Sequence, residues 1–151
     1  MNKNEILISL SESESSRFGK EEFARQSFPQ KVFSAIWAVE SEVNNGGFSQ
    51  YFSNDSAESI SFVVQALETI GAPETANICN RALLAAFPRG LPISIETLHS
   101  TASDFSEKVL AELEPLDHEF SGYPHNLTEL LFAYVAAHPE EFGTLPEPDD
   151  A

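Results

Sequence analysis

Apolar side chains recur at helical spacing along most of the chain. The most regular stretch is residues 127–138, where apolar positions recur every three or four residues and so line one side of a helix. No stretch shows the alternation of apolar and polar positions that predicts half-buried strands between turns. The sequence predicts an all-α fold of seven or eight helices, short ones included. The expected helical segments are about 2–10, 20–27, 32–43, 55–70, 73–87, 95–102, 104–114 and 127–138, with a further turn at 116–120.

Start and stop signals place several of the helix ends. Asn126 and Glu129 have the spacing of a capping box, and Ser94 can cap the short helix that follows it. Asp55 is expected to open the helix over 55–70. Pro115 is expected to end the helix that begins near Asp104, because proline lacks the backbone N–H that a helix interior needs.

Residues 32–54 hold the densest group of large apolar side chains, including Trp37, the only tryptophan. The first half of this stretch has helical period, and Trp37 falls on its apolar side, so we expect that ring to be largely buried. The run Asn44-Asn45-Gly46-Gly47 comes next, and Asn and Gly tolerate the left-handed backbone found at helix ends. We therefore predict a sharp bend, with a second aromatic segment over 48–52 directly after it.

The bend is also where the chain resembles a known family. Residues 42–48, followed by Gln50, Tyr51, Phe52 and Asn54, are similar to the signature of the DNA-mimic protein 19-like family. Weaker pieces follow in the same order, among them Ile70-Gly71-Ala72 and the closing run from His138 to Phe142, so the resemblance spans about residues 29–142. The signature residues, which we interpret as mainly structural, are Glu42, Asn44, Asn45, Gly46, Gly47, Phe48, Gln50 and Asn54.

The resemblance implies a fold, a partner and an oligomeric state. The family's named member is an all-helical dimer that occupies the DNA-binding surface of a transcription factor by presenting carboxylates where phosphates would lie. By resemblance, this chain is expected to form a homodimer and to bind a basic DNA-binding protein such as a transcription factor. It is not expected to bind nucleic acid itself. The signature is not the acidic surface, so sharing it supports the fold more than the activity.

The length of 151 residues is that of one domain with a single core. We assign residues 1–143 to one helical domain and residues 144–151, which have little to bury, to a disordered acidic tail. The N-terminus lacks the apolar centre of a signal peptide, and no run approaches the roughly 20 apolar residues that span a bilayer. A cytoplasmic location without membrane association is therefore expected.

Charge is the most informative part of the composition. The formal net charge is −16, and it is uneven: residues 1–89 hold 11 acids and 7 bases, whereas residues 90–151 hold 13 acids and one base, Lys108. Such a surface repels nucleic acid and attracts basic proteins, although solubility alone is the simpler explanation of acidity. The candidate partner-binding residues are Glu96, Asp104, Glu107, Glu112, Glu114, Asp117 and Glu119.

Signatures of catalysis are absent from the sequence, which contains no nucleophile elbow, phosphate-binding loop or zinc-protease motif. We therefore expect a protein that is not an enzyme and needs no cofactor. The triplet 117–119 with His125 offers metal-ligating atoms, but adjacent side chains on a helix point apart, so no metal site is predicted. Cys79 is interpreted as a small core residue.

Two other functions stay open. One is an immunity-like inhibitor of a basic toxin or nuclease, which would use the same electrostatic attraction on a different partner. The other is a small-ligand or enzyme pocket at the bend, formed by Glu40, Asn45, Gln50 and Asn54. Glu40 falls within the apolar arc of its helix, so it is either a carboxylate at the rim of the core or a buried acid with a raised pKa.

Overall fold

The computed structural model describes residues 1–12 and 22–149. Over these residues the fold is all-α, as predicted, with eight α-helices, one 3₁₀ helix and no strand. Of the helix expected near 20–27, residues 20 and 21 lie outside the described residues, and only one 3₁₀ turn forms after them. The elements are α1 (Lys3–Glu12), η2 (Phe23–Arg25), α2 (Phe28–Asn54), α3 (Ala57–Thr69), α4 (Pro73–Ala86), α5 (Ile95–Ser103), α6 (Glu107–Ser121), α7 (Leu127–Ala136) and α8 (Pro139–Phe142).

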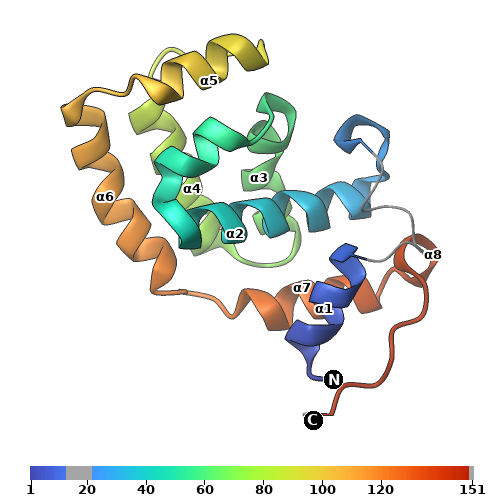
Figure 1. Cartoon of the computed structure of the whole chain (residues 1–151). Helices are drawn as coiled ribbons and strands as arrows, with labels where there is room; N and C mark the ends of the chain where they lie inside the picture. The colour runs from blue at the N-terminus through green and yellow to red at the C-terminus, as the bar shows by residue number, and fades with distance from the viewer. Residues whose placement is uncertain (13–21, 150–151) are drawn as a thin grey trace.

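The long helix α2 runs through the middle of the molecule and contacts most of the other helices (Figure 1). Helix α3 packs along α2, and α4 packs against α3 and α6, with Gly71 in the turn between α3 and α4. Helices α5 and α6 lie at its C-terminal end, whereas α1, α7, α8 and both chain termini lie at the other end (Figure 1). The helix begins with a capping box in which Ser27 and Gln30 exchange side-chain and backbone hydrogen bonds.

One face of α2 supplies the centre of the core, including Val32, Phe33, Ile36, Val39 and the aromatic residues after the bend, all fully or almost fully buried. Trp37, which was expected to be largely buried, is intermediate in burial. It packs against the edge of the core and stacks on Phe33 with 5.3 Å between ring centroids. Replacing Trp37 with Ala should therefore cost less than the roughly 3–5 kcal/mol typical of a fully buried tryptophan.

The prediction that Pro115 ends a helix is wrong, since α6 continues through it to Ser121. The only hydrogen bond that proline removes would join its nitrogen to the carbonyl of Ala111, and both residues are exposed, so water can satisfy that carbonyl. Leu113 and Leu116 are buried on either side of the proline and hold the helix together. Leu110, on the same helix, is 44 % exposed.

Two further boundaries differ from expectation. Helix α3 is opened by Ser56, whose side chain accepts the N–H of Ser59, while Asp55 is the C-terminal cap of α2. Helix α6 is opened by Ser106, so Asp104 precedes it and caps the end of α5. In both cases the N-cap is a serine one or two residues after an aspartate. Serine and aspartate are both favourable N-cap residues, so the sequence alone does not decide which of the two opens the helix.

The C-terminal segment was expected to be a disordered tail. In the structure, residues 144–149 run back along the N-terminus, where the N–H of Asp149 donates to the carbonyl of Met1 over 3.0 Å and Leu145 packs against the core. Residues 150 and 151 lie outside the described residues. None of the helices in the described part of the chain is both long and apolar enough to cross a membrane.

Candidate functional site

The Asn-Asn-Gly-Gly run forms the predicted bend, inside α2. Gly46 (φ −153°, ψ 17°) and Gly47 (φ 79°, ψ −178°) leave helical geometry, and the helix then resumes in a new direction. Only Gly47 of the two has a left-handed φ, a region that L side chains avoid. The bend turns Phe48, Tyr51 and Phe52 into the core, where all three are completely buried.

A hydrogen-bond network of signature residues joins the two halves of α2. The Oε2 atom of Glu42, before the bend, accepts from Gln50 Nε2 (2.8 Å) and from Asn54 Nδ2 (3.0 Å), both after it. Asn45 Nδ2 donates to Gln50 Oε1 over 3.2 Å. The spacing of these residues along the sequence places their side chains within hydrogen-bonding distance of one another across the bend. This gives the signature a structural role.

Asp117 on α6 completes the support of the bend. Its Oδ1 atom accepts the N–H of Phe48 over 2.8 Å, a backbone group that the break in the helix leaves without its usual carbonyl partner. Burial raises the pKa of Asp117, and the hydrogen bond from Phe48 opposes that rise. The assignment of Asp117 to the partner-binding surface is corrected here: the residue is partly buried and faces the bend.

Asp55 lies beside the network and shows a large pKa shift. Burial raises its pKa to about 6, and repulsion from Glu42 adds to the rise, while His99 opposes it. An ordinary aspartate titrates near 3.8. Since the folded-state pKa is the higher one, this residue favours folding below the unfolded pKa, and that contribution is lost as the pH rises through about 6.

We expect Asp55→Asn to raise the free energy of unfolding by about 1 kcal/mol near pH 7, after allowance for solvent screening of a side chain that is partly exposed. The substitution removes the cost of an ionised, partly buried carboxylate while keeping its shape. Urea unfolding of both proteins across the acid and neutral range is the measurement. The gain should vanish below the unfolded pKa, and a gain that is equal at all pH values would contradict the assignment to Asp55.

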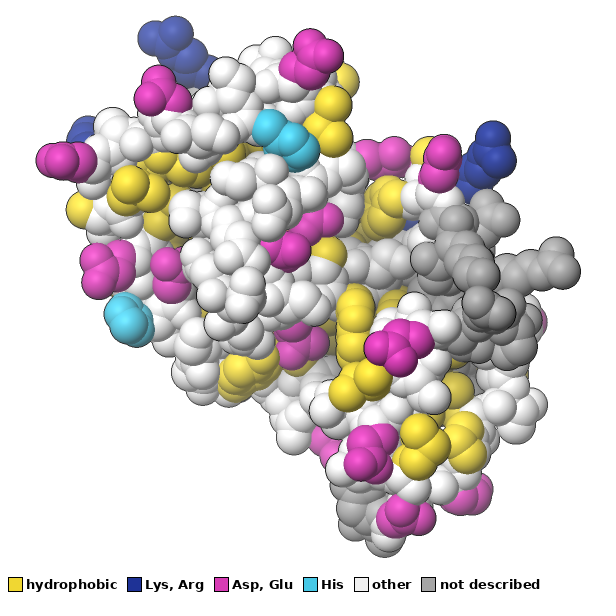
Figure 2. All heavy atoms as spheres, viewed as in Figure 1, with side chains coloured by type: hydrophobic (Ala, Val, Ile, Leu, Met, Phe, Trp, Pro, Cys, Tyr) yellow, Lys and Arg dark blue, Asp and Glu magenta, His cyan; other side chains and the backbone are white. Residues whose placement is uncertain are grey.

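The proposed acidic residues fall into separate groups in the structure. Glu96, Asp104, Glu107, Glu112 and Glu114 are exposed on α5, α6 and the turn between them. Wound at about 100° per residue, Glu107 and Glu114 share the outer side of α6, whereas Glu112 and Glu119 share the flank that faces α4. In the face seen in Figure 2, carboxylate side chains appear as separate spots with neutral surface between them.

Glu119 is exposed but already has a cationic partner. Its two oxygens accept from Arg81 Nη1 and Nη2 of α4 over 2.9 and 2.7 Å, which is a bidentate ion pair. Two of the other candidate metal ligands point elsewhere: Asp117 faces the bend, and His125 accepts the N–H of Glu74 through Nε2. In the described part of the chain no three His, Cys, Asp or Glu residues converge as metal ligands would.

Glu40 belongs to a second cluster, on the other side of α2 from the signature network. Its Oε1 atom accepts the hydroxyl of Tyr123 over 3.0 Å, and Asn44 Nδ2 donates to that same hydroxyl over 2.6 Å. Burial raises the pKa of Glu40, and the Tyr123 hydrogen bond opposes it. The four-residue pocket proposed at the bend therefore does not form, because Glu40 points away from Asn45, Gln50 and Asn54.

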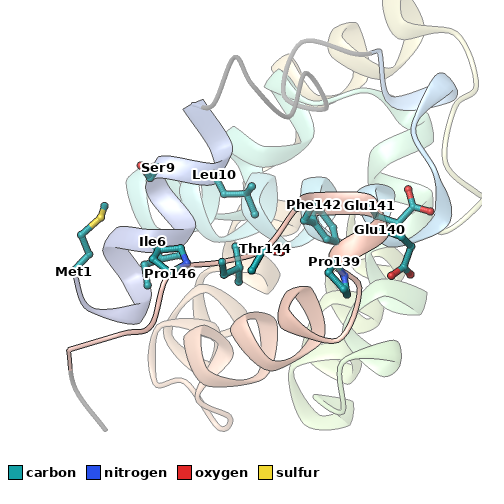
Figure 3. A pocket seen from close by; sticks show the side chains of 12 residues that line it. Met1, Ile6, Ser9, Leu10, Pro139, Glu140, Glu141, Phe142, Thr144 and Pro146 are labelled. Atoms are coloured by element: carbon teal, nitrogen blue, oxygen red, sulfur yellow. The ribbon is translucent and has the colours of Figure 1, made fainter.

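The surface has several shallow hollows. One of about 470 Å³ lies between α1, α8 and the C-terminal segment (Figure 3). Its labelled side chains include Ile6 and Leu10 from α1 and Phe142 from α8, with Thr144 and Pro146 closing it from the C-terminal segment (Figure 3). We assign this hollow no role.

Comparison with known families settles the relationship that the signature suggested. Residues 24–138 match the model of the DMP19-like protein family, which is most of the chain. The chain belongs to the DMP19-like family. Neither the curated proteins nor the solved structures gave a match.

The DMP19-like match includes the whole bend and the helices packed around it. It also includes two site residues that sequence reasoning did not place: Asp117, which was assigned to a different role, and Tyr123, which was not singled out. Each forms a hydrogen bond with a residue about 70 to 80 positions earlier in the chain, Asp117 with Phe48 and Tyr123 with Glu40. The positive φ of Tyr123 (49°) is a feature that helical periodicity cannot indicate.

Proposed function

We propose that this DMP19-like protein binds a basic DNA-binding protein, most simply a transcription regulator, and competes with DNA for its surface. The observation that supports this best is the exposed carboxylate group on α5 and α6, in a half of the chain with Lys108 as its only lysine or arginine. Membership of the DMP19-like family agrees with this function. We place the protein in the cytoplasm, and its action is by occupation of a surface, without catalysis.

Five of the seven candidate carboxylates make up the proposed binding surface. Asp117 supports the bend, and Glu119 is neutralised by Arg81, so neither contributes a free charge. Glu107 and Glu114 lie seven residues apart on one side of α6, which is about 10 Å along the helix axis. One DNA strand advances about 3.4 Å along the axis per phosphate, so this pair has the axial spacing of phosphates three steps apart, while Glu112 lies on the flank of the helix. The surface consists of Glu96, Asp104, Glu107, Glu112 and Glu114.

The test is the affinity of two triple variants with the same change in charge. In the first, Glu107, Glu112 and Glu114 are changed to Gln. In the second, the matched control, the changed glutamates are Glu68, Glu140 and Glu147, which are also exposed but lie on α3, α8 and the C-terminal segment. The partner is recovered by pull-down from the source cell, identified by mass spectrometry, and its affinity measured for each variant.

The α6 variant should bind at least about tenfold more weakly, because each exposed ion pair contributes up to roughly 1 kcal/mol. The control should bind almost as well as the parent, and both should keep the parent's melting temperature. Screening beyond about 8 Å at physiological ionic strength also predicts weaker binding as salt is raised. Equal losses in both variants would show an effect of net charge alone and would contradict a binding surface on α6.

An immunity-like inhibitor remains the second candidate, because an exposed acidic surface would also suit a basic toxin or nuclease. The identity of the recovered partner separates the two functions. The homodimer expected from the resemblance is part of the main proposal, and sedimentation equilibrium of the purified chain tests it.

A further inference from the structure

A hollow of about 460 Å³ opens between α1, the first half of α2 and the loop that follows α6. Two aromatic side chains, Trp37 and Tyr123, and the aliphatic Ile8 line it, and all three are partly or well exposed. Polar groups of Glu40, Ser41, Asn44, Asn4 and Thr128 complete its wall. The hollow lies on the side of α2 opposite the signature network and away from the carboxylates of α6.

The hollow combines a carboxylate with two aromatic side chains in its lining. Glu40 is mostly buried, and its Oε1 atom is fixed by the hydroxyl of Tyr123. None of the described residues donates a hydrogen bond to Oε2, which leaves that oxygen for a ligand. Tyr123 is held at a left-handed φ of 49°, a backbone conformation that a tyrosine adopts only where its surroundings require it.

Among the residues that the structure describes, no lysine or arginine lines the hollow to neutralise Glu40. Lys3, which precedes the lining residue Asn4, is turned away: its Nζ bonds Glu129 Oε2 over 2.6 Å and lies 5.6 Å from the ring centre of Phe132. A negative group beside exposed aromatic rings attracts cations through both the charge and the ring quadrupoles. An anion would be repelled there, and a neutral ligand would leave the charge of Glu40 uncompensated.

We propose that this hollow binds an organic cation, an ammonium or guanidinium group on a short apolar stem. The cationic group bonds Glu40 Oε2, and the stem lies against Trp37, Tyr123 and Ile8. The same chemistry is offered by a free alkylamine and by the side chain of a lysine or arginine. The proposal is independent of the acidic surface on α6 and stands whether or not that surface binds a DNA-binding protein.

Trp37 is the only tryptophan and lies in the wall of the hollow, so its fluorescence reports on occupancy directly. The purified full chain is titrated with n-butylammonium, and with n-butanol and butyrate as neutral and anionic probes of similar size. A saturable change in emission is expected for butylammonium alone. A saturating response of equal affinity to butanol, or none to butylammonium, would overturn the proposal.

Two glutamate variants test whether the fluorescence response comes from binding at Glu40. Glu40→Gln should weaken butylammonium binding about tenfold, because a hydrogen bond to a charged group is replaced by one to a neutral amide. Glu68→Gln, on the exposed face of α3, should bind like the parent. Circular dichroism establishes that each variant is folded, and unchanged affinity in folded Glu40→Gln would overturn the proposal.

A third titration distinguishes the sources of the cation. It uses lysine blocked as the N-acetyl methylamide, which presents the same ammonium group on a peptide backbone. If it binds as butylammonium does, and Glu40→Gln weakens it equally, the hollow accepts a protein side chain. If only butylammonium binds, the ligand is a free amine, and the cation site stands in either case.

Discussion

Phe48→Ala is expected to lower the free energy of unfolding by roughly 3–5 kcal/mol, the range for removing a buried phenylalanine. Phe48 is completely buried directly after the bend, and its ring lies within 6.5 Å of three others, those of Tyr51, Phe52 and Phe120. The last of these belongs to α6, so the substitution leaves a cavity between the two helices. Urea unfolding followed by circular dichroism is the measurement.

Phe28→Ala is the control for this effect. Phe28 begins α2, is 47 % exposed and contacts Phe62 edge-on at 5.5 Å. Its removal should cost about 1 kcal/mol, since about half of its surface is already in water. A loss at Phe48 no larger than that at Phe28 would show that the second aromatic segment is not at the centre of the core.

Gly47→Ala is expected to cost about 2–4 kcal/mol, through two separate effects. The first is the backbone conformation, φ 79° with ψ −178°, which is essentially restricted to glycine and costs an L residue about 1–3 kcal/mol. The second is contact: a Cβ atom at this position would lie 2.5 Å from Asp117 Oδ2, so that carboxylate must move and its hydrogen bond with the N–H of Phe48 is weakened.

Gly143→Ala separates these two effects. Gly143 has nearly the same backbone conformation as Gly47, with φ 81° and ψ 173°, but an added Cβ would meet nothing within 4 Å. Its substitution should therefore show the backbone cost alone, about 1–3 kcal/mol. Thermal or urea unfolding of both variants gives the difference, which is the contribution of the Asp117 contact. Equal losses at the two glycines would contradict the role given to Asp117.

Short-range features of this chain could be predicted from its sequence. Helix positions followed from apolar spacing, and the bend followed from two asparagines and two glycines, because glycine supplies the φ that Gly47 adopts. The wrong predictions concerned helix boundaries, where neighbouring residues offer competing start and stop signals that apolar spacing does not decide between. Pro115 lies inside α6 because burial of Leu113 and Leu116 outweighs one missing hydrogen bond that faces water.

The candidate sites could be predicted only in part, because they depend on contacts between distant parts of the chain. Glu40 was recognised as an unusual acid, but nothing near it in sequence indicates that Tyr123 lies against it. Asp117 looked like one more carboxylate on an acidic helix until the structure placed it on the N–H of Phe48. The bidentate pair of Glu119 with Arg81 likewise depends on how α4 and α6 pack.

Competition with DNA is the decisive test of the proposed acidic surface on α6. The partner recovered by pull-down is bound to a fluorescently labelled DNA duplex, and the protein is added while the anisotropy of the label is followed. We predict that the parent protein and the control variant at Glu68, Glu140 and Glu147 release the DNA, and that release weakens as salt rises. The variant at Glu107, Glu112 and Glu114 should release it at least about tenfold less effectively. A partner that holds the protein and the DNA at the same time, or release by the α6 variant equal to that by the parent, would contradict the account.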